Sequence, residues 1–188
     1  MTHNFPFAEH PVHKNPIDIY GALYDYLVKY TAPPMEPERY FRGNQNRVVI
    51  PMDDDFCTFH IMGMNRIGTN RSQFDASKAQ RDEDGTQSES VLQQVDIQVD
   101  FYSKDDETAY QRAAGHHILF RSGIPTAFLK QYGLSAAYAD DIRHIDNVVE
   151  TNQYLDRWTI TVHLQFWSTL DLEYPWFDSF NLIPKPLF

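Results

Sequence analysis

Two stretches of strict alternation between apolar and polar residues constrain this chain more than any other feature. Residues 91–101 place apolar side chains on one side and polar ones on the other: Val95, Ile97, Val99 and Phe101 against Gln94, Asp96, Gln98 and Asp100. Residues 154–168 repeat the pattern, with Trp158, Ile160, Val162, Leu164 and Phe166 inward and Thr159, Thr161, His163 and Gln165 outward. Successive side chains of a strand point to opposite faces, and a polar outer face is typical of antiparallel sheets covered on one side. The chain is therefore predicted to contain a largely antiparallel sheet.

Helical spacing of apolar residues appears in two longer segments. The first helix is predicted to open at Pro16, a residue suited to a first helical turn, and it carries one apolar stripe: Ile17, Tyr20, Leu23, Tyr24, Leu27 and Val28. The second is predicted over residues 105–121, with acidic residues at its positive N-terminus and one side formed by Ala109, Ala113, His116, His117 and Phe120. Residues 124–132 are expected to add a short helix.

Three further segments, residues 47–51, 56–64 and 142–151, have the composition of strands. In the second of these, Cys57, Phe59 and Ile61 share one face by alternation. The resulting order of helices and strands predicts an α+β fold, in which a mostly antiparallel β-sheet is covered on one face by two main α-helices.

The N-terminal end and one internal segment lack this periodicity, and the C-terminal end is rich in aromatic residues. Residues 1–15 are interpreted as an extended N-terminal arm, residues 16–168 as the α+β domain, and residues 169–188 as an aromatic C-terminal arm. Residues 75–90 are polar and acidic, which indicates a loop insertion that is either functional or simply a mobile connector.

Charge and cysteine content narrow the class of protein. The formal net charge of −10 disfavours nucleic-acid binding, which needs clustered Lys and Arg, and it disfavours anionic membranes. No segment has the length of apolar sequence that a membrane span needs, and residues 1–14 lack a signal-peptide core. Cys57 is the single cysteine, so an intrachain disulfide and a multi-thiolate metal site are both excluded. We expect a soluble protein made in a reducing compartment.

A search for catalytic motifs finds none, so we expect no catalytic residues, no cofactor and no metal. His116 and His117 are adjacent on a predicted helix and lie about 100° apart, which is unsuitable for sharing one ion. The acidic run 53–55 has the composition of a solvated turn, although carboxylates also bind hard cations. A small metal-dependent hydrolase, using the histidines and acidic turns, remains the alternative from another class.

Several segments in this order resemble the phage neck and tail terminator proteins of tailed phages. They are residues 47–51 (RVVIP), 94–102 (QVDIQVDFY), 120–122 (FRS), 138–141 (YADD) with Leu134 before them, and 152–158 (NQYLDRW). The resemblance covers roughly residues 17–168. One departure is Ser103, where a glycine usually follows the Phe-Tyr pair of these proteins.

The resemblance implies a structural virion protein of a bacteriophage and no enzyme activity. It implies a tail terminator that forms a hexameric ring at the head-proximal end of the tail tube, stops tube polymerisation and joins tail to neck. The expected partners are other copies of the chain, the tail tube protein, a neck, head-completion or connector protein, and the terminal ring of a sheath. The resemblance further implies that DNA passes through the lumen without specific binding and that assembly takes place in the host cytoplasm. A head-completion or connector ring subunit is the structural alternative.

Three groups of residues are candidates for contacts in such an assembly. Trp176, Phe177 and Phe180 are expected either to pack on a neighbouring protein or to fold back on the chain's own core. Asp156 and Arg157 form either an ion pair between subunits or an ordinary surface pair. Asp82, Glu83 and Asp84 are candidates to face the lumen or a partner's basic patch, where their charge would repel DNA.

Overall fold

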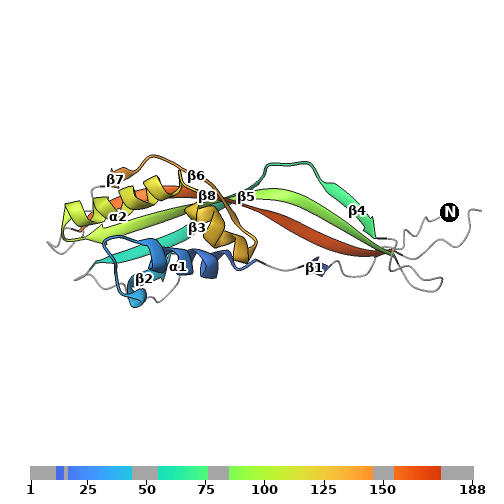
Figure 1. Cartoon of the computed structure of the whole chain (residues 1–188), viewed down its shortest axis with the longest axis horizontal. Helices are drawn as coiled ribbons and strands as arrows, with labels where there is room; N and C mark the ends of the chain where they lie inside the picture. Colours follow the sequence, from blue (N-terminus) through green and yellow to red (C-terminus); the bar gives the residue numbers. More distant parts are fainter. Residues whose placement is uncertain (1–11, 15–16, 44–54, 76–84, 146–154, 175–188) are drawn as a thin grey trace, which may run out of the picture. The chain divides into compact units, whose positions relative to one another are not determined.

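The strands and helices predicted from the periodicity are present in the structure, a computed structural model shown in Figure 1. It describes residues 12–14, 17–43, 55–75, 85–145 and 155–174. The strand predicted over residues 47–51, and most of the one predicted over 142–151, lie outside the described residues.

The chain divides into two compact units, which are described separately. The first contains residues 1–16, 68–91 and 168–188, and the second contains residues 17–67 and 92–167. Two long strands, β5 (Gly85–Ser103) and β8 (Asp156–Tyr174), contribute residues to both units.

Polar residues predominate in the strands of the first unit. β4 (Arg71–Asp75) pairs antiparallel with residues 86–90 of β5, and β1 (Val12–Lys14) pairs antiparallel with residues 169–171 of β8. Ser88 Oγ donates to Asp171 Oδ1 at 2.5 Å. Residues 85–90, assigned to a loop by their polarity, and residues 169–174, assigned to the terminal arm, are therefore strand. Residues 85–90 contain no apolar alternation, and their strand is formed by pairing with β4. Residues 169–174 do alternate, with Leu170 and Leu172 between polar neighbours.

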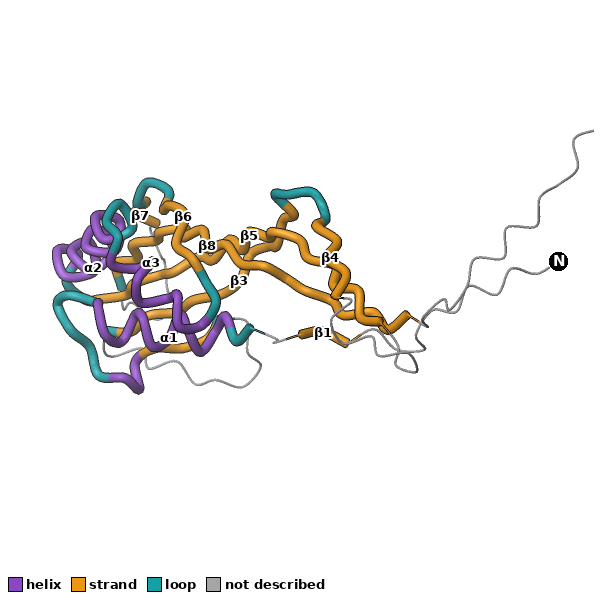
Figure 2. The backbone as a smooth tube through the Cα atoms, turned by 45° about the vertical axis from the view of Figure 1, so that its right-hand side comes forward, coloured by secondary structure: helices purple, strands orange, loops and turns teal. Residues whose placement is uncertain are grey.

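The sheet of the second unit is mixed, with antiparallel pairing predominant. β2 (Tyr40–Arg42) lies parallel to β3 (Phe56–Arg66), and β3 is antiparallel to β5. On the far side of β5 comes β8, which pairs antiparallel with β6 (Ser135–Ala139) and β7 (Arg143–Ile145). Figure 2 shows these strands behind the helices. The predicted α+β fold is confirmed.

Helices cover one face of this sheet. α1 (Ile19–Tyr30) is followed by a 3-10 turn, η1 (Pro37–Arg39). α2 (Asp106–Leu119), α3 (Ile124–Leu129) and the 3-10 turn η2 (Lys130–Tyr132) follow β5.

The first helix begins later than predicted and turns a somewhat different face to the sheet. Asp18, rather than Pro16, marks its start, because the Asp18 carboxylate accepts from the Gly21 N–H at 2.9 Å and caps it. The buried side chains of this helix are Ile19, Ala22, Leu23, Tyr26 and Leu27, so only Leu23 and Leu27 of the predicted stripe are fully buried.

The core lies between these helices and the apolar face of the sheet. It contains the predicted inward residues Val95, Ile97, Val99, Phe101, Ile160, Val162, Leu164 and Phe166, together with Cys57 and Phe59. Burying one such side chain stabilises the fold by about 1.5–3 kcal/mol. The core also encloses a histidine, His116, which is 1% exposed.

The bonds around His116 define its neutral tautomer. Thr31 Oγ1 donates to the Leu27 carbonyl at 2.7 Å, so its oxygen is left to accept from His116 Nε2–H at 3.0 Å. Nδ1 then accepts from the Tyr26 hydroxyl at 3.4 Å. The ring is stacked on Phe101, and burial lowers the pKa of His116 from 6.5 to about 4.

Candidate assembly surfaces

The structure describes two of the residues selected from the sequence as contact candidates. Asp156 and Arg157 begin β8, and each binds a different residue of the same chain. Trp176, Phe177 and Phe180, together with Asp82, Glu83 and Asp84, lie outside the described residues.

Arg157 belongs to a polar network centred on Asp100, on the sheet face opposite the helices. Asp100 is 2% exposed, and it accepts from Arg157 Nη2 at 3.1 Å and from Gln98 Nε2 at 2.9 and 3.0 Å. Thr58 Oγ1 approaches it at 3.5 Å. A buried charge is tolerated when paired in this way, and removal of one partner is costly. The network therefore links β3, β5 and β8.

Burial on this face is greater than the alternation predicted. Thr159, Thr161 and His163 were expected outward, but they are 2%, 5% and 7% exposed. They lie on β8, which has β5 on one side and β6 and β7 on the other, so side chains of the neighbouring strands shield them from solvent.

His163 lies between two carboxylates and connects three strands. Its Nδ1 is 2.6 Å from Asp96 Oδ1 on β5, and its Nε2 is 3.3 Å from Asp140 Oδ1, just after β6. The ring also stacks on Tyr138 at 4.1 Å between centroids. Burial by itself raises the pKa of Asp96, but hydrogen bonds from His163, Gln94 and Asn65 outweigh it and hold that pKa below its ordinary value.

Three side chains from separate segments meet at the start of β8. Asp106 of α2, His144 of β7 and Asp156 of β8 have potential ligand atoms that all lie within 4.8 Å of one another. Such a set can hold a divalent cation, although His144 Nε2 already lies 3.4 Å from Asp156 Oδ1 and Trp158 Nε1 donates to Asp106 Oδ1 at 2.5 Å. Sequence reasoning did not combine these residues, because no spacing connects an α2 residue with a β7 residue.

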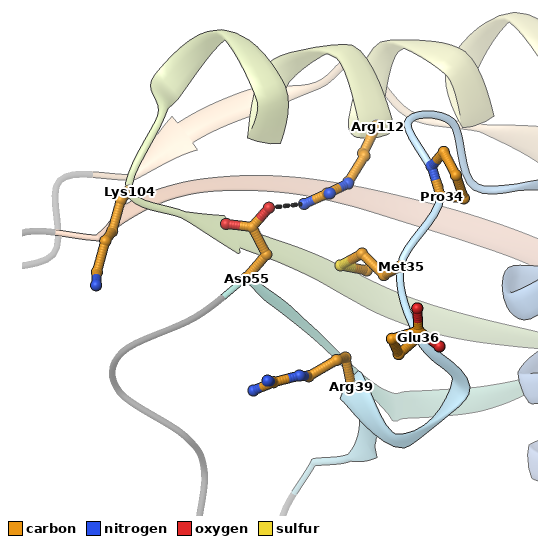
Figure 3. A pocket seen from close by; sticks show the side chains of 7 residues that line it. All are labelled: Pro34, Met35, Glu36, Arg39, Asp55, Lys104 and Arg112. Atoms are coloured by element: carbon orange, nitrogen blue, oxygen red, sulfur yellow. Dashed lines mark hydrogen bonds and ion pairs between the residues drawn. The ribbon is translucent and has the colours of Figure 1, made fainter.

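An open pocket of about 520 Å³ lies beside the start of α2 (Figure 3). Its lining residues are Pro34, Met35, Glu36, Arg39, Asp55, Lys104 and Arg112. Arg112 is fixed by Asp55 Oδ2 at 2.8 Å and by the Pro33 carbonyl at 3.0 Å. Five of these seven residues carry charged side chains: Glu36, Arg39, Asp55, Lys104 and Arg112. The pocket is an open, charged depression, suited to ionic contacts.

Exposed apolar side chains collect near the two edges of the sheet in the second unit. Met62, Met64 and Ile67 are 58%, 50% and 44% exposed at the β3 edge. Ile118, Ile124 and Tyr138 are 68%, 44% and 48% exposed, and they belong to α2, α3 and β6, of which α3 packs on β6. Exposed apolar side chains become candidates for contact surfaces where they lie together.

A protein family is identified for this chain by a family model. Among the described residues, no helix has the length and apolar character needed to cross a membrane. No curated protein matches the sequence. A family model described as phage neck terminator protein matches residues 18–181, which include all of the helices and all of the strands except β1. The chain therefore belongs to the phage neck terminator protein family and is a structural protein of the phage neck.

Proposed function

We propose that the chain is the tail terminator of its phage: a hexameric ring seated on the head-proximal end of the tail tube. It stops tube polymerisation there and joins the tail to the neck. The observation that carries this proposal is the match of the neck terminator family over residues 18–181. The sheet of the second unit supports it as a rigid module with exposed apolar side chains near both edges.

The acidity of the chain suits a ring through which DNA passes. A net charge of −10 repels phosphates, so DNA moves through the lumen without specific binding. Within this proposal Asp82, Glu83 and Asp84 face the lumen or a basic patch on a partner, and the aromatic residues Trp176, Phe177 and Phe180 pack on a neighbouring subunit or a neck protein. Asp156 and Arg157, which are bonded within the chain, stabilise the module that carries these contacts.

Two measurements test the ring and its action. Native mass spectrometry and negative-stain electron microscopy of the purified protein are expected to show closed hexamers. Tube protein polymerised with increasing amounts of the chain is expected to give shorter tubes with a ring on one end. Tubes whose length does not change, together with no ring on their ends, would contradict the proposal.

A capture experiment separates the terminator from the structural alternative. The immobilised chain is incubated with purified tube protein and, separately, with purified portal protein. We expect retention of the tube protein. Retention of portal protein alone would identify a head-completion or connector subunit instead.

A further inference from the structure

A row of apolar side chains begins at the end of β3, on the sheet face opposite the helices of the second unit. Ile67 directly follows β3, and its N–H donates to the Leu92 carbonyl of β5 at 3.0 Å. This bond continues the register in which Arg66 lies opposite Gln93, so Ile67 lies opposite Leu92. Leu92 shares its face with Gln94, because side chains two residues apart on a strand point the same way.

Trp167 extends this row onto β8. Two bonded pairs belong to one antiparallel register of β5 and β8: His163 Nδ1 with Asp96 Oδ1 at 2.6 Å, and Ser90 Oγ with Thr169 Oγ1 at 3.1 Å. The same register places Trp167 opposite Leu92. Phe166 is in the core, so the next side chain, Trp167, projects from the face opposite the helices.

This row, formed by Ile67, Leu92 and Trp167, is exposed on a largely polar face. Trp167 is 52% exposed, Ile67 is 44% exposed, and Leu92 is half-buried. The next pair along β3 and β5 is polar, with Asn65 opposite Gln94. Neighbouring strands lie about 4.8 Å apart, so the row extends over about 10 Å. One or two aromatic side chains are enough to cover it.

The chain carries such side chains beyond the end of β8. Residues 175–188 include Trp176, Phe177 and Phe180, which the proposed function places on a neighbouring protein. Aromatic residues that enter an apolar site are the typical anchors of a protein interface. The composition of this segment therefore matches the Trp167 row.

The length of β8 keeps the first two of these residues away from the row of their own chain. Tyr174, the last residue of β8, comes seven residues after Trp167, and a strand of that length spans about 23 Å. Phe177 comes three residues after Tyr174, so the chain between them reaches at most about 11 Å. Trp176 is closer still to Tyr174. Both residues can reach the row of a neighbouring copy, but not their own.

We propose that the aromatic residues of the segment 175–188 pack on the Trp167 row of a neighbouring copy. This inference rests on the proposed ring, and it names the surface that receives the segment. Each copy then donates one segment and receives another, which is a head-to-tail contact that closes into a ring. Phe180 lies at most about 22 Å along the chain from Tyr174, so the ring brings the end of β8 near the row of the next copy.

A disulfide between copies tests this contact. The variant Asn65→Cys/Ser179→Cys places one cysteine on an exposed position beside the row and the other directly before Phe180, and it removes none of the apolar side chains. Cys57 is fully buried and burial raises the pKa of its thiol, so it stays unreactive. Mild oxidation is expected to give a ladder of covalent oligomers up to the hexamer on a non-reducing gel. A disulfide within one chain gives no ladder.

Three control variants make the result specific. Asn65→Cys alone and Ser179→Cys alone are each expected to give no ladder, and a dimer from either would show contact between two rows or two segments and overturn the proposal. The variant Gln111→Cys/Ser179→Cys, with one cysteine on the exposed side of α2, is expected to stay monomeric on the gel. A ladder from it equal to the first would show contact without preference for the row, and would also overturn the proposal.

Substitution of Trp167 tests the row without any cysteine. The side chain is half-exposed, so Trp167→Ser is expected to leave the fold intact, as circular dichroism would verify, and to abolish rings. Trp167→Phe keeps an aromatic ring at the same position and is expected to retain them. Rings that form as readily with Trp167→Ser as with the natural chain would overturn the proposal.

Electron microscopy of the same samples separates this proposal from the proposed function. Closed rings without a disulfide ladder would disprove the contact with the row and leave the terminator function intact. Samples with neither rings nor a ladder, in solution and on tube ends, would contradict both. If the double cysteine variant fails to fold, the comparison of Trp167→Ser with Trp167→Phe decides.

Discussion

Asp100 on β5 and Arg157 on β8 form an ion pair of 3.1 Å, in which the carboxylate is almost completely buried. The pair connects the two longest strands of the chain. Gln98 and Thr58 donate hydrogen bonds to the same carboxylate, so protein groups replace the water that would otherwise solvate Asp100. The stability of the second unit should therefore depend on Arg157.

Replacement of Arg157 by Met should destabilise the fold by about 3–5 kcal/mol, because Asp100 is left as an unpaired buried charge. Urea denaturation followed by circular dichroism measures the change. Arg143→Met, on the exposed β7, is the control and should change stability by no more than about 0.5 kcal/mol. The double variant Asp100→Asn/Arg157→Met should recover part of the lost stability, because no buried charge remains. If Arg157→Met and the control Arg143→Met lower the free energy of unfolding equally, the Asp100–Arg157 pair does not stabilise the fold.

The sequence predicts the apolar core around this network but not the polar contacts within it. Alternation correctly placed Val95, Ile97 and Val99 in the core, because apolar burial leaves a period of two in the sequence. Polar residues leave no such sign of their partners. The bond from Arg157 to Asp100 joins positions far apart in the chain, and Asp156 and Arg157 are neighbours that bind in different directions.

Strand ends were harder to predict than strand centres for the same reason. Residues 85–90 of β5 are held by backbone pairing with β4 and by polar side chains such as Ser88 and Ser90. A run of Ser, Thr, Gln and Glu has the composition of a loop unless its pairing partner is known. The cluster of Asp106, His144 and Asp156 was not foreseen either, because it depends on how α2, β7 and β8 meet.

His116 should make the protein sensitive to moderate acid. Its pKa is about 4 in the folded protein and ordinarily 6.5, so between these values the unfolded chain binds a proton that the folded chain does not. Stability is complete above pH 6.5 and decreases as the pH falls, by about 3 kcal/mol at pH 4. Urea denaturation at several pH values measures this slope.

The variant His116→Gln isolates that effect. The variant protein should be less stable than the natural chain at neutral pH. Because glutamine takes up no proton, the loss of stability between pH 6.5 and 4 should be smaller in the variant by the contribution of His116. Any decrease that remains comes from other groups, such as Asp96, whose lowered pKa acts at lower pH. An unchanged slope in His116→Gln would show that His116 does not titrate on unfolding.

The cluster of Asp106, His144 and Asp156 should retain no transition metal in stoichiometric amount. Its side chains are 58%, 36% and 37% exposed, and Trp158 already donates to Asp106. Metal analysis after dialysis with Zn²⁺ or Mn²⁺, for the natural chain and for His144→Ala, should give equal and low contents. One bound metal per chain that disappears in His144→Ala would revive the hydrolase alternative.

Removal of residues 175–188 should abolish assembly while leaving the fold intact. Truncation after Tyr174 preserves β8, including the residues that pair with β1, whereas truncation after Ser168 would also remove strand residues. The proposed role of Trp176, Phe177 and Phe180 in contacts with a neighbour predicts a soluble monomer with unchanged circular dichroism. Insoluble or unfolded protein would instead indicate that these aromatic residues complete the chain's own core.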